Sequence, residues 1–245
     1  MPLLESWLEK HERDGTPENV TCLREREGGR DRVFQSLVEV AKDHFVAAGL
    51  LDRIGYPLAA TVLRAKVPTR IATQSGDLGE ILATEYVRER TDYQVPINRL
   101  RYKDDREMAM RGDDVIGVRK VDGRVQALKI EAKSRAQLSG AVVKEACASL
   151  QRNRSRPSAS SVAFVSLRLR EEGRDAEAEL VEQLLGEQFT DWDVEHLVFT
   201  LSGNDPTGVL SEHAKALRRR LAGIRVVDHQ KFIRKVYEAI HAAVP

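Results

Sequence analysis

Apolar positions along the chain follow two spacings, which separate segments expected to be helical from segments expected to be extended. Apolar residues three and four positions apart are typical of a helix with one buried face. This spacing predicts helices at residues 3–8, 33–51, 58–67, 76–89, 136–152, 175–188, 210–221 and 230–243. Apolar runs rich in β-branched or aromatic residues predict strands at residues 93–102, 161–169, 194–201 and 224–227, and a pair of strands within residues 111–134.

The order of these elements predicts an α/β (α+β) fold in which a mixed central sheet is flanked by helices. Strand and helix alternate from residue 161 onward, so we expect a C-terminal α/β layer that extends the same sheet. Residues 71–245 then form the main domain, and residues 1–70 form a mostly helical N-terminal region. Residues 18–25 read as a short strand or an irregular crossing. This region is either a capping layer or a surface that docks a partner.

Composition places the chain among ordinary soluble proteins and leaves its partners open. Of its 245 residues, 42% are hydrophobic and 31% are charged. The formal net charge is +1, from 39 basic and 38 acidic residues, which speaks neither for nor against nucleic acid. Cys22 and Cys147 read as free thiols of a reducing cytosol. No apolar run approaches the roughly 20 residues that a membrane span needs, and no signal peptide is visible, so we expect a cytoplasmic protein without a membrane.

A predicted hairpin in the middle of the chain contains charges that an apolar core would reject. Asp122 and Gly123 are typical of a two-residue hairpin turn, because Gly accepts the positive φ that such a turn needs. The flanking segments are apolar except for three residues, Asp114, Glu131 and Lys133. A charge inside a core is costly unless it is paired or binds a metal. These three residues therefore mark the candidate site.

Strand geometry brings the three charged side chains together. Side chains alternate between the two faces of a strand, so Glu131 and Lys133 share one face, about 6.6 Å apart along the strand, and Lys129 shares it too. Pairing through the turn places Asp114 across from Glu131, and a shift of one residue would substitute Asp113. Carboxylates from two neighbouring strands beside a lysine form a hard-oxygen site for Mg²⁺ or Mn²⁺. The lysine can hold a water or steady the charge on a reacting phosphate.

The helix at residues 76–89 adds a further acidic candidate. Ser75 or Asp77 can cap its first turn. Glu80 lies one residue from the apolar stripe, near the start of this helix. An acidic residue there can simply complement the helix dipole, or it can belong to the site.

These residues resemble the core of the PD-(D/E)xK nucleases: Asp114, then Glu131-Ala132-Lys133, after a helix that carries Gly79-Glu80. The resemblance implies a restriction-endonuclease-like fold in the order helix, three-stranded meander, helix and strand. It implies that Asp114 and Glu131 bind Mg²⁺ or Mn²⁺, with Glu80 and the backbone carbonyl of Ala132 completing the metal site. Lys133 would assist the attacking water.

The sequence from Gly76 to Lys133 is closer still to one branch of these enzymes, and the resemblance covers roughly residues 70–170. The stretches GDLGEILATEYV, RGDDVIGV and KIEAKS are similar to the nuclease subunit of the Hachiman anti-phage defence system. This resemblance implies a Mg²⁺-dependent deoxyribonuclease that acts on DNA with a separate helicase or ATPase subunit. The N-terminal 70 residues would be the place to look for that partner's interface.

Two basic segments have an open interpretation. Arg99, Arg101 and Lys103 alternate along an expected strand, and Lys144, Gln151, Arg152 and Arg154 follow the helix at 136–152. Each set either faces DNA phosphates, as in non-specific binding, or forms a solvated surface.

Other chemistries find no support in the sequence. It has neither a G-x-S-x-G elbow nor a G-x-x-x-x-G-K-[ST] phosphate loop, so it encodes no ATPase. Its six histidines form no pair at i, i+4. The competing hypothesis is a catalytically silent nucleic-acid-binding or scaffold subunit on the same fold. In such a protein Lys133 would form an ion pair with Glu131 or Asp114.

Overall fold

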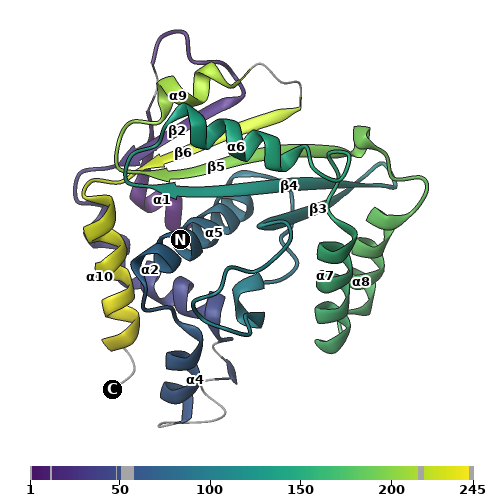
Figure 1. Cartoon of the computed structure of the whole chain (residues 1–245), viewed down its shortest axis with the longest axis horizontal. Coiled ribbons are helices and arrows are strands. Elements are labelled where there is room, and N and C mark those ends of the chain that lie inside the picture. Colours follow the sequence, from purple (N-terminus) through teal and green to yellow (C-terminus); the bar gives the residue numbers. More distant parts are fainter. Residues whose placement is uncertain (1, 12, 48, 51–57, 215–217, 243–245) are drawn as a thin grey trace.

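A computed structural model describes residues 2–11, 13–47, 49–50, 58–214 and 218–242 (Figure 1). Its strands form one six-stranded mixed sheet in the order β1-β2-β6-β5-β4-β3. β1 pairs with β2 and β3 pairs with β4 in antiparallel fashion, whereas the four central strands run parallel. The strands are β1 (Leu8–Lys10), β2 (Val20–Glu25), β3 (Val115–Val121), β4 (Arg124–Arg135), β5 (Val194–Ser202) and β6 (Arg219–Arg225).

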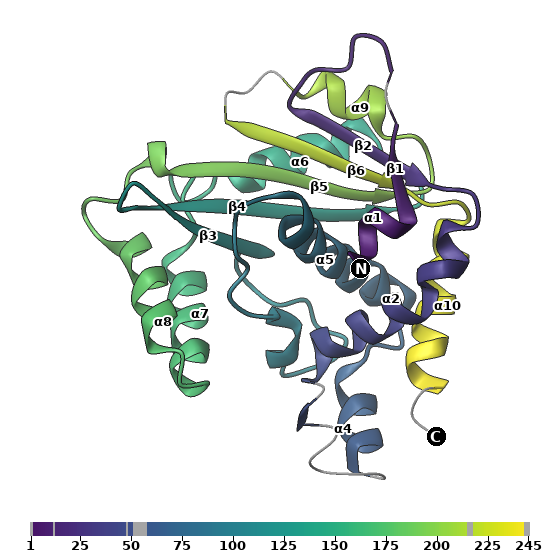
Figure 2. The same cartoon turned by 180° about the vertical axis from the view of Figure 1, so that it is seen from behind.

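Helices cover both faces of this sheet, as Figures 1 and 2 show from opposite sides. α2, α5 and α10 pack on one face, α6 and α9 on the other, and α7 with α8 beside the β3–β4 hairpin. The helices are α1 (Leu3–Trp7), α2 (Gly29–Phe45), α4 (Leu58–Lys66), α5 (Ile71–Arg90), α6 (Gly140–Leu150), α7 (Ala159–Glu171), α8 (Asp175–Glu182), α9 (Thr207–Glu212) and α10 (His229–Ala242), with 3₁₀ turns η1 (Arg99–Tyr102), η2 (Gln183–Leu185) and η3 (Asp191–Asp193). The predicted mixed α/β sheet flanked by helices is confirmed.

The N-terminal residues share the core of the rest of the chain. Leu4 and Trp7 of α1 and Phe45 of α2 lie in one buried cluster with residues of α5 and α10. Residues 20–25 form strand β2, which pairs with β6, so the strand alternative for this stretch is confirmed. The first 70 residues therefore contribute strands and helices to the same sheet and core as the residues that follow.

The strand predicted at residues 161–169 is wrong, because this stretch lies in helix α7. Two adjacent apolar residues favoured a buried strand, but Val162, Val165 and Leu169 also follow a helical spacing, and they are the buried ones. Ser158 caps the helix, since its side chain accepts a hydrogen bond from the backbone N–H of Ser161. This serine cap favours the helix over the strand for a stretch whose apolar spacing fits both.

Three further predictions differ from the structure. Residues 93–102 form an isolated bridge at Gln94 and then η1, so the expected three-stranded meander has two strands, β3 and β4. α5 begins at Ile71, so Ser75 and Asp77 lie inside the helix and cap nothing. The helix predicted at 210–221 is also wrong in extent: α9 ends at Glu212, and residues 219–221 belong to β6.

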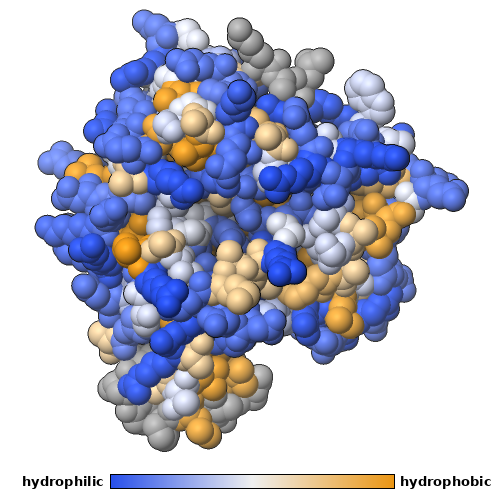
Figure 3. Space-filling view, in the orientation of Figure 1, coloured by the Kyte–Doolittle hydropathy of each residue, from blue (hydrophilic) through white to orange (hydrophobic). Residues whose placement is uncertain are grey.

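The surface of the face in Figure 3 is mostly hydrophilic, with hydrophobic residues gathered toward α7 and α8 and around α4. Large exposed apolar side chains there include Leu167 and Leu58. None of the helices in the described ranges combines the length and the apolarity that crossing a membrane requires.

Candidate functional site

The β3–β4 hairpin carries the first candidate ligand into register with the second. Asp122 and Gly123 both adopt positive φ, 48° and 81°, as the predicted two-residue turn requires. The paired strands place Val115 opposite Ile130, so Asp114 precedes β3 at the level of Glu131. The Oδ2 atom of Asp114 accepts a hydrogen bond of 2.9 Å from the backbone N–H of Ala132. The predicted hairpin and its register are confirmed.

Helix α5 lies directly against β4 because it has a glycine at the contact. A Cβ atom at Gly79 would stand 3.2 Å from Cβ of Ser134. One turn earlier, the hydroxyls of Ser75 and Ser134 are hydrogen-bonded at 2.8 Å. This close approach sets the distance between Glu80, the next residue of α5, and the hairpin.

A larger residue at this contact is expected to loosen the helix from the strand. Gly79→Val should lower the free energy of unfolding by about 1–3 kcal/mol, because its methyl groups overpack a tight contact. Gly76→Ala is the matched control in the same helix. Its Cβ would meet nothing within 4 Å, so it should raise stability by about 0.5–1 kcal/mol. Urea unfolding of both variants checks the pair, and equal effects would contradict the packing argument.

Glu80 and Asp114 form a half-buried pair of carboxyl groups whose negative charges are not fully compensated. Burial and the charge of Glu131 raise the pKa of Asp114 to about 6. Burial and the charge of Asp114 raise the pKa of Glu80 well above its ordinary value. The Oε2 atom of Glu80 is buried without a hydrogen-bond partner among the residues described. Asp114 thus links Glu80 on the helix to Glu131 on the strand, and the three carboxyl groups repel one another.

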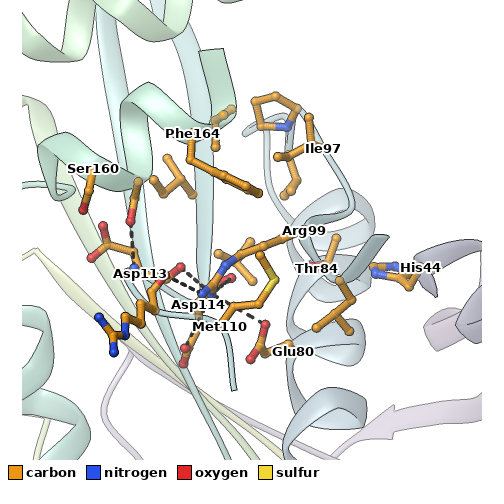
Figure 4. Close-up of a pocket in the computed structure, with 18 residues that line it drawn as sticks. His44, Glu80, Thr84, Ile97, Arg99, Met110, Asp113, Asp114, Ser160 and Phe164 are labelled. Atoms are coloured by element: carbon orange, nitrogen blue, oxygen red, sulfur yellow. Dashed lines mark hydrogen bonds and ion pairs between the residues drawn. The ribbon is translucent and has the colours of Figure 1, made fainter. Parts of the chain in front are cut away.

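Arg99 faces this pair of carboxyl groups (Figure 4). The sequence placed Arg99 in a basic segment but did not predict its position beside Glu80 and Asp114. Its guanidinium lies 3.7 Å from Glu80 and 3.9 Å from Asp114. It also donates hydrogen bonds to the backbone carbonyls of Arg111, Asp113 and Asp114. Arg99 therefore holds the segment that leads into β3 and supplies one positive charge beside two carboxyl groups. Its partners are distant in sequence, so no local spacing signals the role.

Neither interpretation of the first basic segment fits Arg101 and Lys103. Arg101 binds the carboxylate of Asp43 at 2.6 Å, and Lys103 is buried against Asp77 at 2.8 Å. The two side chains do not form a freely solvated row, and Lys103 is too deeply buried to contact a DNA phosphate. The segment is instead an internal set of ion pairs that fixes η1 against α2 and α5.

Glu131 and Lys133 share one face of β4, as predicted. Their side chains form an ion pair of 2.8 Å, and Lys133 also binds Glu145 of α6 at 3.1 Å. Burial lowers the pKa of Lys133, but its hydrogen bonds and charge interactions with Glu131 and Glu145 outweigh burial and raise it. Lys133 is therefore held as a cation beside Glu131.

The neighbouring Asp113 has a different set of contacts from Asp114. Its carboxylate lies 3.4 Å from the buried amine of Lys129 and accepts a hydrogen bond from the backbone N–H of Ser158. Lys129 also donates to the carbonyls of Arg152 and Arg156. Asp113 is thereby engaged in fixing the connection between α6 and α7, whereas Asp114 faces Glu80 and Glu131.

A cavity of about 300 Å³ opens beside the carboxyl pair. Glu80, Arg99 and Asp114 line one part of it, and apolar side chains such as Ile97 and Phe164 line another (Figure 4). It lies between α5 and η1 on one side and β3 and α7 on the other. The pair is therefore reachable from a partly apolar hollow.

The donor set suits a hard divalent cation, which prefers carboxylate and carbonyl oxygens. A cation near Glu80 and Asp114 would bind the Oε2 atom that has no hydrogen bond, and it would offset the burial and repulsion that raise both pKa values. In the arrangement observed, no three His, Cys, Asp or Glu side chains of the described residues are grouped closely enough to hold a metal ion. The residues fit a metal by chemistry, and the side chains would have to close around it.

Fold and site together define a mixed α/β protein with three carboxyl groups and a lysine gathered at a hairpin and a helix. The family model named HamA matches residues 1–240, and the chain belongs to the HamA family. The chain is also similar to the Hachiman protein HamA of Bacillus cereus, with 27% identity over 175 residues. That match covers 71% of this chain and 58% of the relative, a little over half of its length. The predicted resemblance to a protein of the Hachiman system is thus confirmed, and the family match extends well beyond residues 70–170.

Proposed function

We propose that this chain is a metal-dependent DNA nuclease of the PD-(D/E)xK type, with a restriction-endonuclease-like core, acting in anti-phage defence. The observation that supports it most is the convergence of Glu80, Asp114 and Glu131 next to Lys133. Glu80 on α5 is far in the sequence from Glu131 and Lys133 on β4, yet the charges of these groups, linked through Asp114, shift one another's pKa values. A purely structural cluster has no need to leave the buried Oε2 atom of Glu80 without a hydrogen bond, with only the guanidinium of Arg99 at 3.7 Å.

Each residue has a distinct role under this proposal. Asp114 and Glu131, with the backbone carbonyl of Ala132 and with Glu80, would hold Mg²⁺ or Mn²⁺. When bound, such an ion lowers the pKa of a water and polarises a phosphoryl oxygen. Lys133 orients the water and offsets negative charge on the phosphate. Glu145 in turn fixes the position of the Lys133 amine.

The proposed system includes a second protein. The relative is named as a protein of the Hachiman system, and the chain has no phosphate-binding loop of its own. We propose that a separate helicase or ATPase subunit works with this nuclease and docks on the N-terminal 70 residues. Supercoiled plasmid incubated with both proteins, with and without ATP, tests whether the partner changes the cleavage rate.

The test of the nuclease itself is plasmid cleavage by the purified chain in Mg²⁺ or Mn²⁺. We expect nicked or linear product with either metal, none in EDTA, and none with folded Glu131→Ala. If the isolated chain is silent, the same assay with the partner and ATP is required to give metal-dependent product. Cleavage that persists in EDTA or in folded Glu131→Ala would refute the proposed site.

One observation favours a second candidate, a catalytically silent scaffold. The Lys133–Glu131 ion pair of 2.8 Å is the contact that such a protein would use in place of a metal. Calorimetric titration of the chain with Mn²⁺ separates the two. Heat of binding that disappears in Glu131→Ala favours the nuclease, and no binding up to millimolar Mn²⁺ favours the scaffold.

A further inference from the structure

The loop after α6 has a backbone that most residues avoid. Asn153, Arg154 and Ser155 are consecutive, and their φ values are 58°, 55° and 66°. A left-handed conformation costs energy at every residue with a side chain, and three in a row are uncommon outside glycine-rich turns. Such strain persists only where the surrounding structure imposes it.

A buried lysine and a half-buried histidine hold the loop in this conformation. The amine of Lys129 on β4 donates to the carbonyls of Arg152 at 3.0 Å and Arg156 at 2.9 Å, one on each side of the strained residues. Nε2 of His196 on β5 is hydrogen-bonded to the carbonyl of Ser155 at 2.9 Å. The loop is therefore fixed by the sheet on its inner side, and Asn153 and Arg154 are exposed.

What the loop presents is positive charge. Arg152 and Arg154 are exposed, and so is Arg218, whose carbonyl accepts a hydrogen bond from the backbone N–H of His196. None of the three guanidinium groups makes a hydrogen bond or ion pair with another residue that the structure describes. We call Arg152, Arg154 and Arg218 the arginine surface.

Neighbouring arginines behave differently. Arg156 is paired with Asp191 and Arg220 with Glu195. Burial lowers the pKa of His196, and the charges of Arg219, Lys129 and Arg218 lower it further. The region around the loop is thus positive, and its unpaired charges lie on the outside.

The arginine surface is connected to the candidate site by two direct routes. Lys129, which clamps the loop, also pairs with Asp113, the neighbour of Asp114. Arg152 follows α6, on which Glu145 binds Lys133. The hydrogen bond from Lys133 lowers the pKa of Glu145, and the charge of Arg152 contributes in the same direction. A DNA strand lying along α6 would therefore meet both the loop and Lys133.

We propose that the arginine surface binds backbone phosphates of the DNA strand that is cut at Glu131 and Lys133. The inference rests on the proposed function for its substrate class. Arg152 and Arg154 on the rigid loop, with Arg218 beside it, have no side-chain partner among the described residues. Such guanidinium groups suit phosphates, because contacts to phosphate dominate non-specific affinity and require no base reading. The rigid backbone also lowers the entropy that a flexible loop would lose on binding.

The experiment measures DNA binding by full-length Glu131→Gln, which leaves the DNA intact, in EDTA. A fluorescein-labelled duplex and the matching single strand are titrated over a range of salt concentrations by anisotropy. The test variant adds Arg152→Ala, Arg154→Ala and Arg218→Ala. The control variant adds Lys231→Ala, Arg234→Ala and Lys235→Ala, which removes three exposed charges from α10 at the other end of the molecule.

We expect the test variant to bind at least about 10-fold more weakly at low salt and its salt slope to fall by about 2–3, since each phosphate contact contributes about 0.9. The control variant should match the parent. Unchanged slope in the test variant, equal losses in both variants, or no DNA binding by the parent would each overturn the inference. Plasmid cleavage by the wild type is scored separately, so failure of the nuclease proposal remains distinguishable from failure of the binding surface.

Discussion

Asp114→Asn is expected to lower the rate of DNA cleavage by about 10³-fold, whereas Asp113→Asn leaves the rate within about 10-fold. The two residues are adjacent, but their surroundings separate their roles. Asp114 lies between Glu80 and Glu131, and burial with the charge of Glu131 raises its pKa to about 6. Asp113 is bound to Lys129 and to the backbone of Ser158.

The same pair should show the opposite order in stability. Asp113→Asn removes the counter-charge of the buried Lys129 and should cost about 3 kcal/mol of unfolding free energy. Asp114→Asn relieves repulsion among carboxyl groups and should leave stability unchanged or raise it. Cleavage rates and urea unfolding of both variants provide the measurement. If Asp113→Asn were the inactive variant and Asp114→Asn active, the assignment of the ligand would be reversed.

Lys103→Met is expected to lower the free energy of unfolding at neutral pH by about 3–5 kcal/mol, because it leaves a buried carboxylate without its cation. Lys103 is 2% exposed and Asp77 is 4% exposed. The amine donates to both carboxylate oxygens of Asp77 and to the carbonyl of Arg106. Few other partners are available to Asp77, so the substitution destabilises the protein mainly through the buried carboxylate of Asp77.

The pH dependence of this loss has a defined sign. Burial raises the pKa of Asp77 to about 6 even though Lys103 lowers it, and removing Lys103 raises that pKa further. Between the unfolded and folded pKa values the native state binds more protons, so stability falls as pH rises. The variant should therefore be less destabilised at pH 5 than at pH 7.5, as measured by urea unfolding at both.

The double variant Asp77→Leu with Lys103→Met is the control for this argument. It removes both charges, and an apolar pair of similar volume is often as stable as a buried ion pair. We expect it to recover most of the stability lost by Lys103→Met alone. A double variant as unstable as the single one would mean that the lysine acts through packing and through Arg106, not through Asp77.

The parts of the site that the sequence predicted are those that depend on local geometry. Alternation along a strand put Glu131 and Lys133 on one face, and the Asp122-Gly123 turn set the register that brings Asp114 level with Glu131. Both follow from two-residue periodicity and from one turn type. Helix α10, which has a strong apolar stripe, was predicted close to its observed bounds for the same reason, whereas α5 begins five residues before its predicted start.

The parts that were missed depend on contacts between distant segments. Arg99 belongs to a stretch interrupted by Pro96, and only the folded chain brings it to Glu80 and Asp114. The strand predicted at residues 161–169 failed because a short apolar run fits both periods, and a serine cap settles the choice. The buried pairing of Lys103 likewise has no local signature, since its partner lies 26 positions away.

The position of β2 in the sheet has a consequence for how the protein is made. β2 lies between β1 and β6, and the contact between Asn19 and Arg219 joins residues 200 positions apart. A ribosome that has synthesised β2 must complete nearly the whole sheet before the partner strand β6 emerges. Until then β2 has an open edge, a hazard for association with other chains. Such long-range pairing also slows folding, so the N-terminal segment is expected to join the finished sheet late, after translation of β6.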